Sequence, residues 1–274
     1  MNDLHVIPVG VIHSSVRSQK EMPPLGVDGE IEIFPRYADT LEGIGDHSHL
    51  IVVGWMHRAD RGVHRAVPRK ISPDLPEKGV FALRSPSRPN PVSVTVVHLH
   101  RVRAGRFLEV SFLDLIDGTP LLDIKPYQPG TDCIFSARTP DRSDRFVVIT
   151  PERYRDDLTR QAVGFHGEYC PAVAIAVRMM MTATYVMGSD LRREEICCSL
   201  GTNPCINDAL IGITGARFGN GRLVIPADWP CTSVYTISGP EFLLEFSIVS
   251  MPGEIRLVHS ASDGELFLLK VKKY

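Results

Sequence analysis

The sequence lacks several features that would assign a protein to a familiar class. No apolar run reaches the roughly 18–20 residues that a membrane-spanning helix needs. The opening residues, MNDLHVIPVG, contain no basic segment followed by an apolar core, so we expect no secretory signal. No G-x-G-x-x-G opens a helix after a strand; the nearest match, GIGDHS at 43–48, lacks the third glycine. We therefore expect a cytoplasmic protein with no membrane partner and no dinucleotide-binding fingerprint.

An excess of charge of one sign is also missing. Residues 1–150 hold 18 Lys and Arg against 18 Asp and Glu, and residues 151–274 hold 12 against 14. Extensive contact with nucleic acid usually accompanies a basic excess, so an RNA partner would have to use a local patch. Six cysteines are present, five of them after residue 160. In a cytoplasmic chain they are expected as buried thiols or metal ligands, not as disulfides.

The first half consists of strand-like segments. β-branched and apolar residues dominate 6–14, 29–34, 49–56, 93–102 and 106–114, as is typical of strands. Ala104-Gly105 joins the last two at hairpin distance, and only 37–44 and 60–67 suit short helices. Strands without regular intervening helices predict an all-β barrel or sandwich over residues 1–145.

The second half mixes helices and strands. The polar segment 137–145 predicts a domain boundary near 140–155, and residues 155–274 are expected to form an α+β domain. Helices are expected at 152–165, 171–187 and 207–214, because proline stands at a first helical position and glycine follows two helix ends. Strand-like segments return in RLVIPA, TSVYTI, EFLLEFSIV, EIRLV and ELFLLKV.

The segment RSPSRPNPVS, residues 84–93, combines three prolines with two arginines. Each proline fixes its own φ and restricts the residue before it, so the loop would lose little conformational freedom when a ligand binds. Arg84 and Arg88 offer forked donors for a carboxylate, and Asn90 offers a donor and an acceptor for the edge of a ring. Composition alone allows both a preformed ligand cradle and a rigid surface turn with solvated arginines.

A second polar segment is DLIDGTPLLDIKPY, residues 114–127. It places Asp117 in a turn and sets Asp123, Lys125 and Tyr127 on one alternating face of a strand. A carboxylate, an ammonium and a phenol side by side are unusual on the core side of a strand and unremarkable on a solvent face.

Together, these two segments resemble the TsaA-like, or TrmO, family, which carries R-x-x-x-R-P-N-P-[IV]-G and then D-G-T-P-x-x-D-I-K-P-Y. The resemblance covers roughly residues 7–138. It implies a small β-barrel that binds S-adenosylmethionine in a crevice completed by the second copy in a homodimer. It also implies methylation of N6-threonylcarbamoyladenosine beside the tRNA anticodon. Two departures stand out: the glycine that closes the loop is Ser93, and the early P-R-Q signature is replaced by SQKEMP at 18–23.

The resemblance and the chemistry of methyl transfer suggest residue roles. The sulfonium must be held so that its methyl group faces the acceptor, and the acceptor nitrogen or thiol must lose a proton. Arg88 is the candidate for the methionine carboxylate. Asp117 or Asp123 is the candidate base, oriented by Lys125 or Tyr127. The expected cofactor-binding residues are Leu83, Arg84, Ser85, Arg88, Asn90, Pro91, Val92, Ser93, Asp117 and Thr119.

A different set of donors precedes the helices of the second half. His166 and Cys170 stand directly before the helix expected at 171–187, and Cys205 stands before the next one. A helix N-terminus favours the thiolate form of cysteine, and one imidazole with two thiolates would bind Zn²⁺ and leave one coordination position open. Two capped helices with buried cysteines would give the same pattern.

Residues 163–235 resemble the FmdE-type domain, which takes its name from formylmethanofuran dehydrogenase. Its H-G-H-x-C-P-G appears as HGEYCPA, and its N-x-C-x-x-D-A appears as NPCINDA. The resemblance therefore implies metal binding by the same histidine and two cysteines. The family's second histidine is Glu168 and its third cysteine is Ala216 here, so we expect three protein ligands.

Three classes of function fit these patterns. The first is an S-adenosylmethionine-dependent methyltransferase that acts on tRNA, as the resemblance implies. The second uses the same donor to methylate a small thiol, or another acceptor delivered by the metal-type domain, and the balanced charge favours it. The third is a cofactor- and metal-responsive sensor without turnover.

Overall fold

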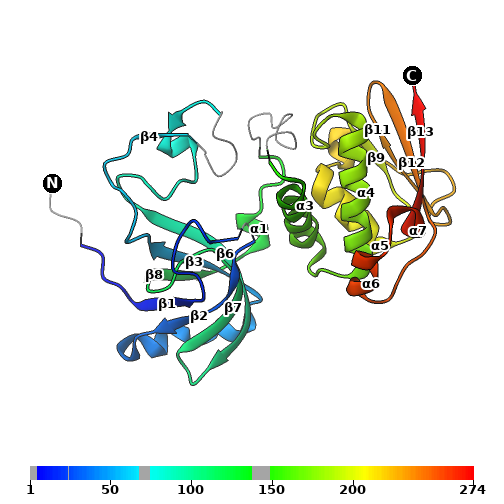
Figure 1. The fold of residues 1–274 in the computed structure, drawn as a ribbon. Helices are drawn as coiled ribbons and strands as arrows, with labels where there is room; N and C mark the ends of the chain where they lie inside the picture. Colours follow the sequence, from blue (N-terminus) through cyan, green and yellow to red (C-terminus); the bar gives the residue numbers. More distant parts are fainter. Residues whose placement is uncertain (1–4, 24, 68–74, 138–148) are drawn as a thin grey trace. The chain divides into compact units, whose positions relative to one another are not determined.

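The computed structural model describes residues 5–23, 25–67, 75–137 and 149–274. The chain divides into two compact units, Met1–Ile134 and Phe135–Tyr274 (Figure 1). Apart from Ala137, the predicted boundary segment 137–145 lies outside the described residues. Among the helices of the described ranges, none combines the length and the hydropathy that crossing a bilayer requires.

The first unit is a closed barrel of six antiparallel strands in the order β1-β2-β7-β6-β3-β8. These strands are β1 Gly10–Ser14, β2 Val27–Ile33, β3 His49–Trp55, β6 Val92–Arg103, β7 Phe107–Leu113 and β8 Pro120–Pro126. β8 closes the barrel on β1, where Gly10 lies opposite Leu121. The predicted all-β small barrel is therefore confirmed, and closure pairs the two strands that would otherwise be edges.

Side chains that alternate between the two faces of each strand build the barrel core. Along β3 and β6, every second residue is buried over most of the strand. The outward positions of β6 include Val94 and Val96, whose side chains are 50% and 37% exposed. The sheet therefore has an apolar interior and, at this place, an apolar outer surface as well.

The alternation is interrupted in β8. Its register against β3 shifts next to Gly54, so that Leu121 and Ile124 both pack in the barrel core although they are three residues apart. A bulge of this kind moves the following side chains to the opposite face. Asp123 and Lys125 consequently lie on the solvent side of the strand.

The hairpin between β6 and β7 is confirmed. Ala104 and Gly105 both have positive φ, 47° and 67°, as a primed two-residue turn requires. The short helix predicted at 37–44 is a 3₁₀ helix, η1 Pro35–Leu41. The remaining short helices of this unit are η2 Ile44–Asp46, η3 Val80–Ala82 and α1 Pro129–Asp132.

The helix predicted at 60–67 is wrong. The structure has a turn there, followed by β4 Arg65–Ala66, which pairs with β5 Lys78–Gly79. The Asp60 carboxylate accepts a hydrogen bond of 2.8 Å from the backbone N–H of Gly62. This local bond competes with helix formation, and the glycine that follows gives the helix little intrinsic support.

The second unit combines a five-stranded sheet with helices, so the α+β prediction is confirmed. Its sheet has the order β10-β9-β11-β12-β13, with β9 and β10 parallel and the other pairs antiparallel. The strands are β9 Cys197–Ser199, β10 Leu223–Val224, β11 Val234–Ser238, β12 Phe242–Ile248 and β13 Phe267–Lys273. The helices are α3 Pro151–His166, α4 Pro171–Met187, α5 Pro204–Thr214, η4 Phe218–Asn220, α6 Ile255–Ser260 and α7 Asp263–Leu266.

Helix α4 is the centre of this unit (Figure 1). It contacts α3, α5, α6 and β12, and ten of its 17 residues are buried. A helix that is apolar on all sides belongs in the interior of a domain. Pro171 begins the helix and Gly188, with a φ of 60°, follows its end, as the sequence predicts.

The strand predicted from EIRLV is wrong, because these residues belong to helix α6. Val258 is fully buried in it, and Arg178 of α4 donates from Nη1 to the carbonyl groups of Val258 (2.8 Å) and Ala261 (2.7 Å). A cation that satisfies the last carbonyl groups stabilises a helix end. The donor lies 80 residues earlier in the chain, so the local pattern could not reveal it.

Candidate cofactor cradle and candidate metal site

The loop 84–93 is held in shape by one of its own side chains. Arg88 donates from Nε to the carbonyl of Ser85 (2.8 Å) and from Nη2 to those of Val80 (3.0 Å) and Leu83 (2.5 Å). A rigid fork that satisfies three carbonyl groups cross-links the chain around it. The loop is therefore preformed by this network as well as by its prolines, and Nη1 is the Arg88 donor without an acceptor in the described part of the protein.

Arg84 and Asn90 are the exposed donors of the same loop. Arg84 uses Nη2 to bind the carbonyl of Val94 at 2.8 Å. Asn90 accepts a bond from the N–H of Val92 through its backbone carbonyl, while its side-chain amide has no partner among the described residues. Arg84 and Asn90 therefore supply most of the donors that remain free for a ligand, whereas Arg88 mainly holds the backbone of the loop in place.

The two conspicuous sequence motifs meet at Gly54. Buried Ser93 accepts the N–H of Gly54 (3.0 Å) and donates to its carbonyl (3.1 Å) through the same hydroxyl. A Cβ atom at Gly54 would lie 2.9 Å from that hydroxyl oxygen and 3.2 Å from Cγ2 of Thr119. The end of the loop and the D-G-T-P turn therefore touch the same backbone position, and Ser93 stands there without an unsatisfied polar group.

Asp117 fastens the turn between β7 and β8 to the end of β1. Its Oδ1 accepts the N–H of Ser14 at 3.1 Å, and its own N–H donates to the carbonyl of Val16 at 2.8 Å. Thr119, buried in the same turn, donates through its hydroxyl to Ile116 at 2.7 Å. The half-buried carboxylate is held at the end of the barrel where the loop 84–93 begins β6.

The structure also brings Asp123 and Lys125 together, as an ion pair of 2.7 Å with side chains 48% and 64% exposed. Exposed pairs of this kind contribute about 0–1 kcal/mol to stability. Asp123 lies beside Val53, which in turn lies beside Val94, the residue whose carbonyl binds Arg84. The pair and Arg84 therefore share the outer face formed by β8, β3 and β6.

Tyr127 lies just beyond the end of β8. Its N–H donates to the carbonyl of His49 at 3.0 Å, and the two rings meet edge to face with centroids 6.5 Å apart. Burial, followed by the nearby Cys133 thiol, raises the pKa of the phenol. Tyr127 is therefore a neutral hydrogen-bonding group at the end of the predicted alternating row.

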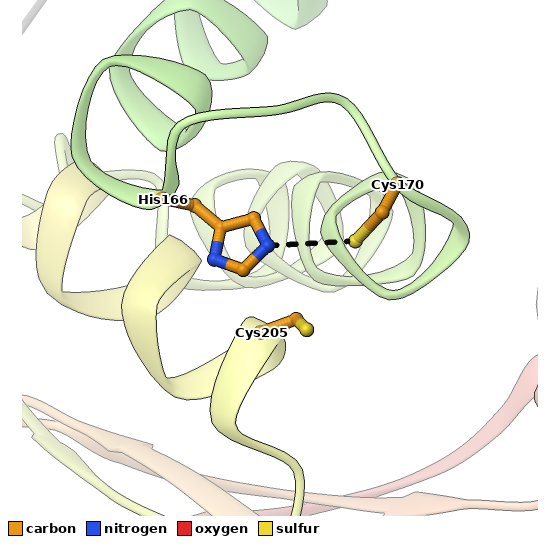
Figure 2. Close-up of side chains that lie close together, drawn as sticks. All are labelled: His166, Cys170 and Cys205. Atoms are coloured by element: carbon orange, nitrogen blue, oxygen red, sulfur yellow. Dashed lines mark hydrogen bonds between the residues drawn. The ribbon is translucent and has the colours of Figure 1, made fainter.

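The second candidate site lies where three helix ends meet (Figure 2). His166 is the last residue of α3, Cys170 is the N-cap of α4, and Cys205 lies in the first turn of α5. Gly167, with a φ of 105°, ends α3, and the Asn203 side chain caps α5. Because α5 begins at Pro204, three residues earlier than predicted, the second cysteine lies inside the helix and not before it.

The three predicted ligands form one cluster. One ligand atom from each of His166, Cys170 and Cys205 lies within 4.8 Å of the other two, and His166 Nε2 is 3.7 Å from Cys170 Sγ. Partly buried nitrogen and sulfur donors suit Zn²⁺. Glu168 is exposed and Ala216 is buried, and neither belongs to the cluster. Three protein ligands would leave one tetrahedral position for a water or a substrate.

The histidine of this cluster is oriented by a residue that the site prediction omits. Asp208 Oδ2 lies 3.0 Å from Nδ1 of His166, which fixes Nε2 as the nitrogen that faces the cysteines. Burial, followed by the adjacent Cys170 thiol, raises the pKa of Cys205, and a dication would counter both effects. The C-x-x-D spacing within NPCINDA is the signal for Asp208, because residues three apart share a helix face.

Family models match both units. The model described as the tRNA-methyltransferase O N-terminal domain matches residues 11–133, which include nearly the whole barrel. The model described as FmdE, of the molybdenum formylmethanofuran dehydrogenase operon, matches residues 165–228, which include the His166, Cys170 and Cys205 cluster.

Curated relatives carry consistent names. A probable S-adenosyl-L-methionine-binding protein of Archaeoglobus fulgidus is 38% identical over 225 residues, or 79% of this chain, and the match spans 59% of that relative's length. An S-adenosyl-L-methionine-binding protein of the same organism is 43% identical over 131 residues, covering 46% of this chain and 91% of the relative. The tRNA (adenine(37)-N6)-methyltransferase of Escherichia coli K12 is 32% identical over 55% of this chain and 67% of its own length.

Proposed function

This chain belongs to the family of the tRNA-methyltransferase O N-terminal domain, and on that premise we propose that it is an S-adenosylmethionine-dependent methyltransferase acting on tRNA. The acceptor is N6 of the threonylcarbamoyl-modified adenosine beside the anticodon. The observation that carries the proposal is the contact of the two family motifs at Gly54. This contact places the preformed loop 84–93, with the free donors of Arg84 and Asn90, next to the turn that carries the Asp117 carboxylate.

The cofactor is held by the loop 84–93. Arg84, with Nη1 of Arg88, binds the methionine carboxylate, since a guanidinium matches a carboxylate in charge and geometry. The Asn90 amide and nearby backbone groups read the adenine edge. The framework bonds of Arg88 keep these donors in place before the cofactor arrives, which reduces the entropy lost on binding.

The acceptor nitrogen gains the methyl carbon as the carbon–sulfur bond breaks, and it gives up one proton. A carboxylate near that nitrogen accepts the proton. Each carboxylate accepts one backbone N–H, Asp123 from Ile124 (2.9 Å) and Asp117 from Ser14 (3.1 Å). Asp123 is favoured for this role because it also shares an outer face with Arg84 and pairs with Lys125. Turnover and its pH profile in Asp123→Asn and Asp117→Asn decide between them: full activity with an unchanged profile removes a residue from the role.

A second copy of the chain completes the cofactor crevice. The support for this homodimer is the outer face of β3 and β6, where Val94 and Val96 are exposed between Arg84 and the Asp123–Lys125 pair. Burying such valines against a partner gains about 25 cal/mol per Å². Sedimentation of Val94→Glu tests this: a dimer that becomes a monomer supports it, and an unchanged dimer contradicts it.

Mass spectrometry of tRNA nucleosides tests the reaction. Purified protein, S-adenosylmethionine and tRNA that carries threonylcarbamoyladenosine should give a product 14 Da heavier, the mass of one CH₂. The same tRNA without the threonylcarbamoyl group is the matched substrate and should stay unmethylated. In cells that lack the protein, the methylated nucleoside should disappear. Its persistence, together with no transfer in vitro, would reject tRNA as the acceptor.

The cluster in the second unit favours one further candidate acceptor, a small thiol. A Zn²⁺ held by His166, Cys170 and Cys205 has an open position and would stabilise the thiolate of a bound thiol. Labelled methyl in a thiol pool, with none in tRNA, supports this reaction. Cofactor binding without any labelled product supports a sensor. Metal analysis of the purified protein establishes whether zinc is bound.

A further inference from the structure

Arginines at the two ends of the barrel differ in the groups that they bind. β6 runs from one end, where Val92 lies opposite Trp55, to the other end, where Arg103 enters the hairpin. At the hairpin end, three arginines form ion pairs with glutamates of neighbouring strands, and each of these cations is compensated locally. The pairs are Arg101–Glu109 (2.7 Å), Arg103–Glu30 (2.5 Å) and Arg106–Glu32 (2.6 Å).

At the opposite end, Arg58 and Arg61 bind backbone carbonyl groups instead, although Arg65 in the same segment pairs with Glu77 at 2.8 Å. Arg58 donates from Nη1 to the carbonyl of Arg17 at 2.8 Å. Arg61 donates from Nε to the carbonyl of Pro89 at 3.0 Å, and its guanidinium lies 5.5 Å from the ring centroid of Trp55. In the described ranges, no carboxylate forms an ion pair with Arg17, Arg58 or Arg61, and all three residues are exposed.

The segment that contains these contacts carries an excess of positive charge. The described residues 56–67 and 75–91 contain six Lys and Arg against two Asp and Glu, although the whole chain has a formal net charge of −2. Arg58 also contributes, after burial, to the lowered pKa of His57. The patch that an RNA partner would need therefore exists at the loop end of the barrel, beside the cradle.

We propose that Arg17, Arg58 and Arg61 bind the phosphate groups of a single-stranded RNA segment next to the cofactor cradle. The inference rests on the proposed tRNA methylation and adds the surface that recognises the substrate. The guanidinium groups of Arg58 and Arg61 are each held by one carbonyl contact, and that of Arg17 makes no hydrogen bond within the described residues. All three therefore keep N–H donors for a phosphate. Arg17 lies in the segment 15–23 and the other two lie in the segment 56–64, and the bond from Arg58 to the carbonyl of Arg17 joins these two segments.

One exposed aromatic side chain, on a turn bonded to the segment of the arginines, favours a single strand over a duplex. Phe81 is 84% exposed, and the turn that carries it is tied to the arginine loop by the N–H of Val80, which donates to the carbonyl of His64 at 3.0 Å. Unstacked bases bind to such rings, whereas double-stranded RNA is read mainly through its backbone. An anticodon loop offers both phosphates and unstacked bases.

Salt-dependent binding tests the surface. Affinity for unmodified tRNA transcript is measured by fluorescence anisotropy between about 50 and 200 mM salt. The slope of log K against log salt falls in magnitude by about 0.7–0.9 for each phosphate contact removed. Arg17→Ala should lower it by about 0.7–0.9, and the triple variant Arg17→Ala, Arg58→Ala, Arg61→Ala by about 2–3. Calorimetry with S-adenosylmethionine should give the wild-type affinity.

A matched control carries Arg101→Ala, Arg103→Ala and Arg106→Ala, which removes the same net charge from the paired end. Its slope should equal that of the wild-type protein. An unchanged slope in the loop-end triple variant overturns the surface, while methylation of tRNA by the wild-type protein would leave the proposed function standing. Absence of both RNA binding and methyl transfer in the wild-type protein rejects the two together.

Two single variants, Arg17→Ala and Phe81→Ala, test the charge and the stacking separately. Arg17 makes no side-chain hydrogen bond in the described part of the structure, so Arg17→Ala should keep the wild-type melting temperature and still lower the slope. Phe81→Ala should weaken RNA binding by roughly fivefold or more without changing the slope, because it removes stacking and not charge. A change in the sedimentation of the RNA-free triple variant would make the surface a protein contact and overturn the proposal.

Discussion

In the barrel, the candidate cofactor residues belong to a loop whose shape depends on one side chain, whereas the candidate metal ligands of the second unit stand at three helix ends. Arg88 bonds to three carbonyl groups of the first region. In the second, His166, Cys170 and Cys205 take their places from the end of α3 and the beginnings of α4 and α5.

The difference lies in what each framework uses to fix its functional groups. Helix ends are fixed by backbone hydrogen bonds and caps, so a ligand can be replaced there without moving its neighbours. The cradle is fixed by side-chain donors, so replacing the central arginine frees several backbone groups together. Replacing a candidate metal ligand should therefore change metal binding without changing stability. Replacing Arg88 in the loop 84–93 should change cofactor binding and stability together.

The largest expected effect is on metal binding. Cys205→Ser keeps the size of the side chain but replaces a thiolate with a hydroxyl, which is a poor zinc ligand. Zinc affinity, measured by competition with a chelator, should fall by more than about 100-fold, the most that loss of a supporting hydrogen bond costs a metal site. The metal-free variant should melt like the metal-free wild-type protein. The exposed Cys231 supplies the control, and equal zinc affinity in Cys205→Ser and Cys231→Ser would exclude the cluster.

The cradle should respond differently to Arg88→Ala. Removing the fork leaves three carbonyl groups without their donors, which should lower the free energy of unfolding by about 2–4 kcal/mol and abolish detectable cofactor binding. Urea denaturation and calorimetry measure the two effects. Arg84→Ala is the matched control, because Arg84 is exposed and makes one such bond. It should weaken cofactor binding with little loss of stability, and the reverse ranking of the two variants would refute the framework role of Arg88.

The fold could be predicted from sequence where local rules decide the structure. The hairpin was predicted from the two-residue spacing of Ala104-Gly105 between two strand-like segments. Gly105 adopts its positive φ readily, and the turn imposes the same region on Ala104. Helix α4 was predicted from its proline, its apolar run and Gly188. The errors fell where a distant contact decides: Arg178 of α4 stabilises α6, which the sequence suggested as a strand.

The candidate site was predictable in its chemistry but less so in its assignments. The candidate metal ligands were predicted from residue types before helices, and the structure brings all three together. The role of Arg88 as a framework residue could not be read from the sequence, because a forked donor serves a carboxylate and a backbone carbonyl equally well. Gly54 was missed because its importance comes from atoms of Ser93 and Thr119, remote in sequence.

Gly54 gives a prediction of intermediate size. Gly54→Ala would place Cβ 2.9 Å from Oγ of Ser93, and such overpacking should lower the free energy of unfolding by about 1–3 kcal/mol. Adding Ser93→Gly removes the nearest atom and should restore part of that loss. A double-mutant cycle measured by urea denaturation tests the coupling. Additive losses would mean that the two positions do not share the contact at the base of the cradle.

The smallest effect should come from substitution of Asp208, which tests whether the helix ends alone orient the candidate metal ligands. Asp208→Asn keeps an oxygen that can accept from Nδ1 of His166 but replaces a charged acceptor with a weaker neutral one. Zinc affinity should fall by roughly tenfold, and by up to about 100-fold in Asp208→Ala. The absorption spectrum of the Co²⁺ form should shift in both variants, because the orientation of the imidazole changes. Asp228→Asn, at an exposed position outside the cluster, controls for net charge. If the zinc affinity and the Co²⁺ spectrum stay constant in both Asp208 variants, the backbone at the end of α3 orients His166 without the bond to Asp208.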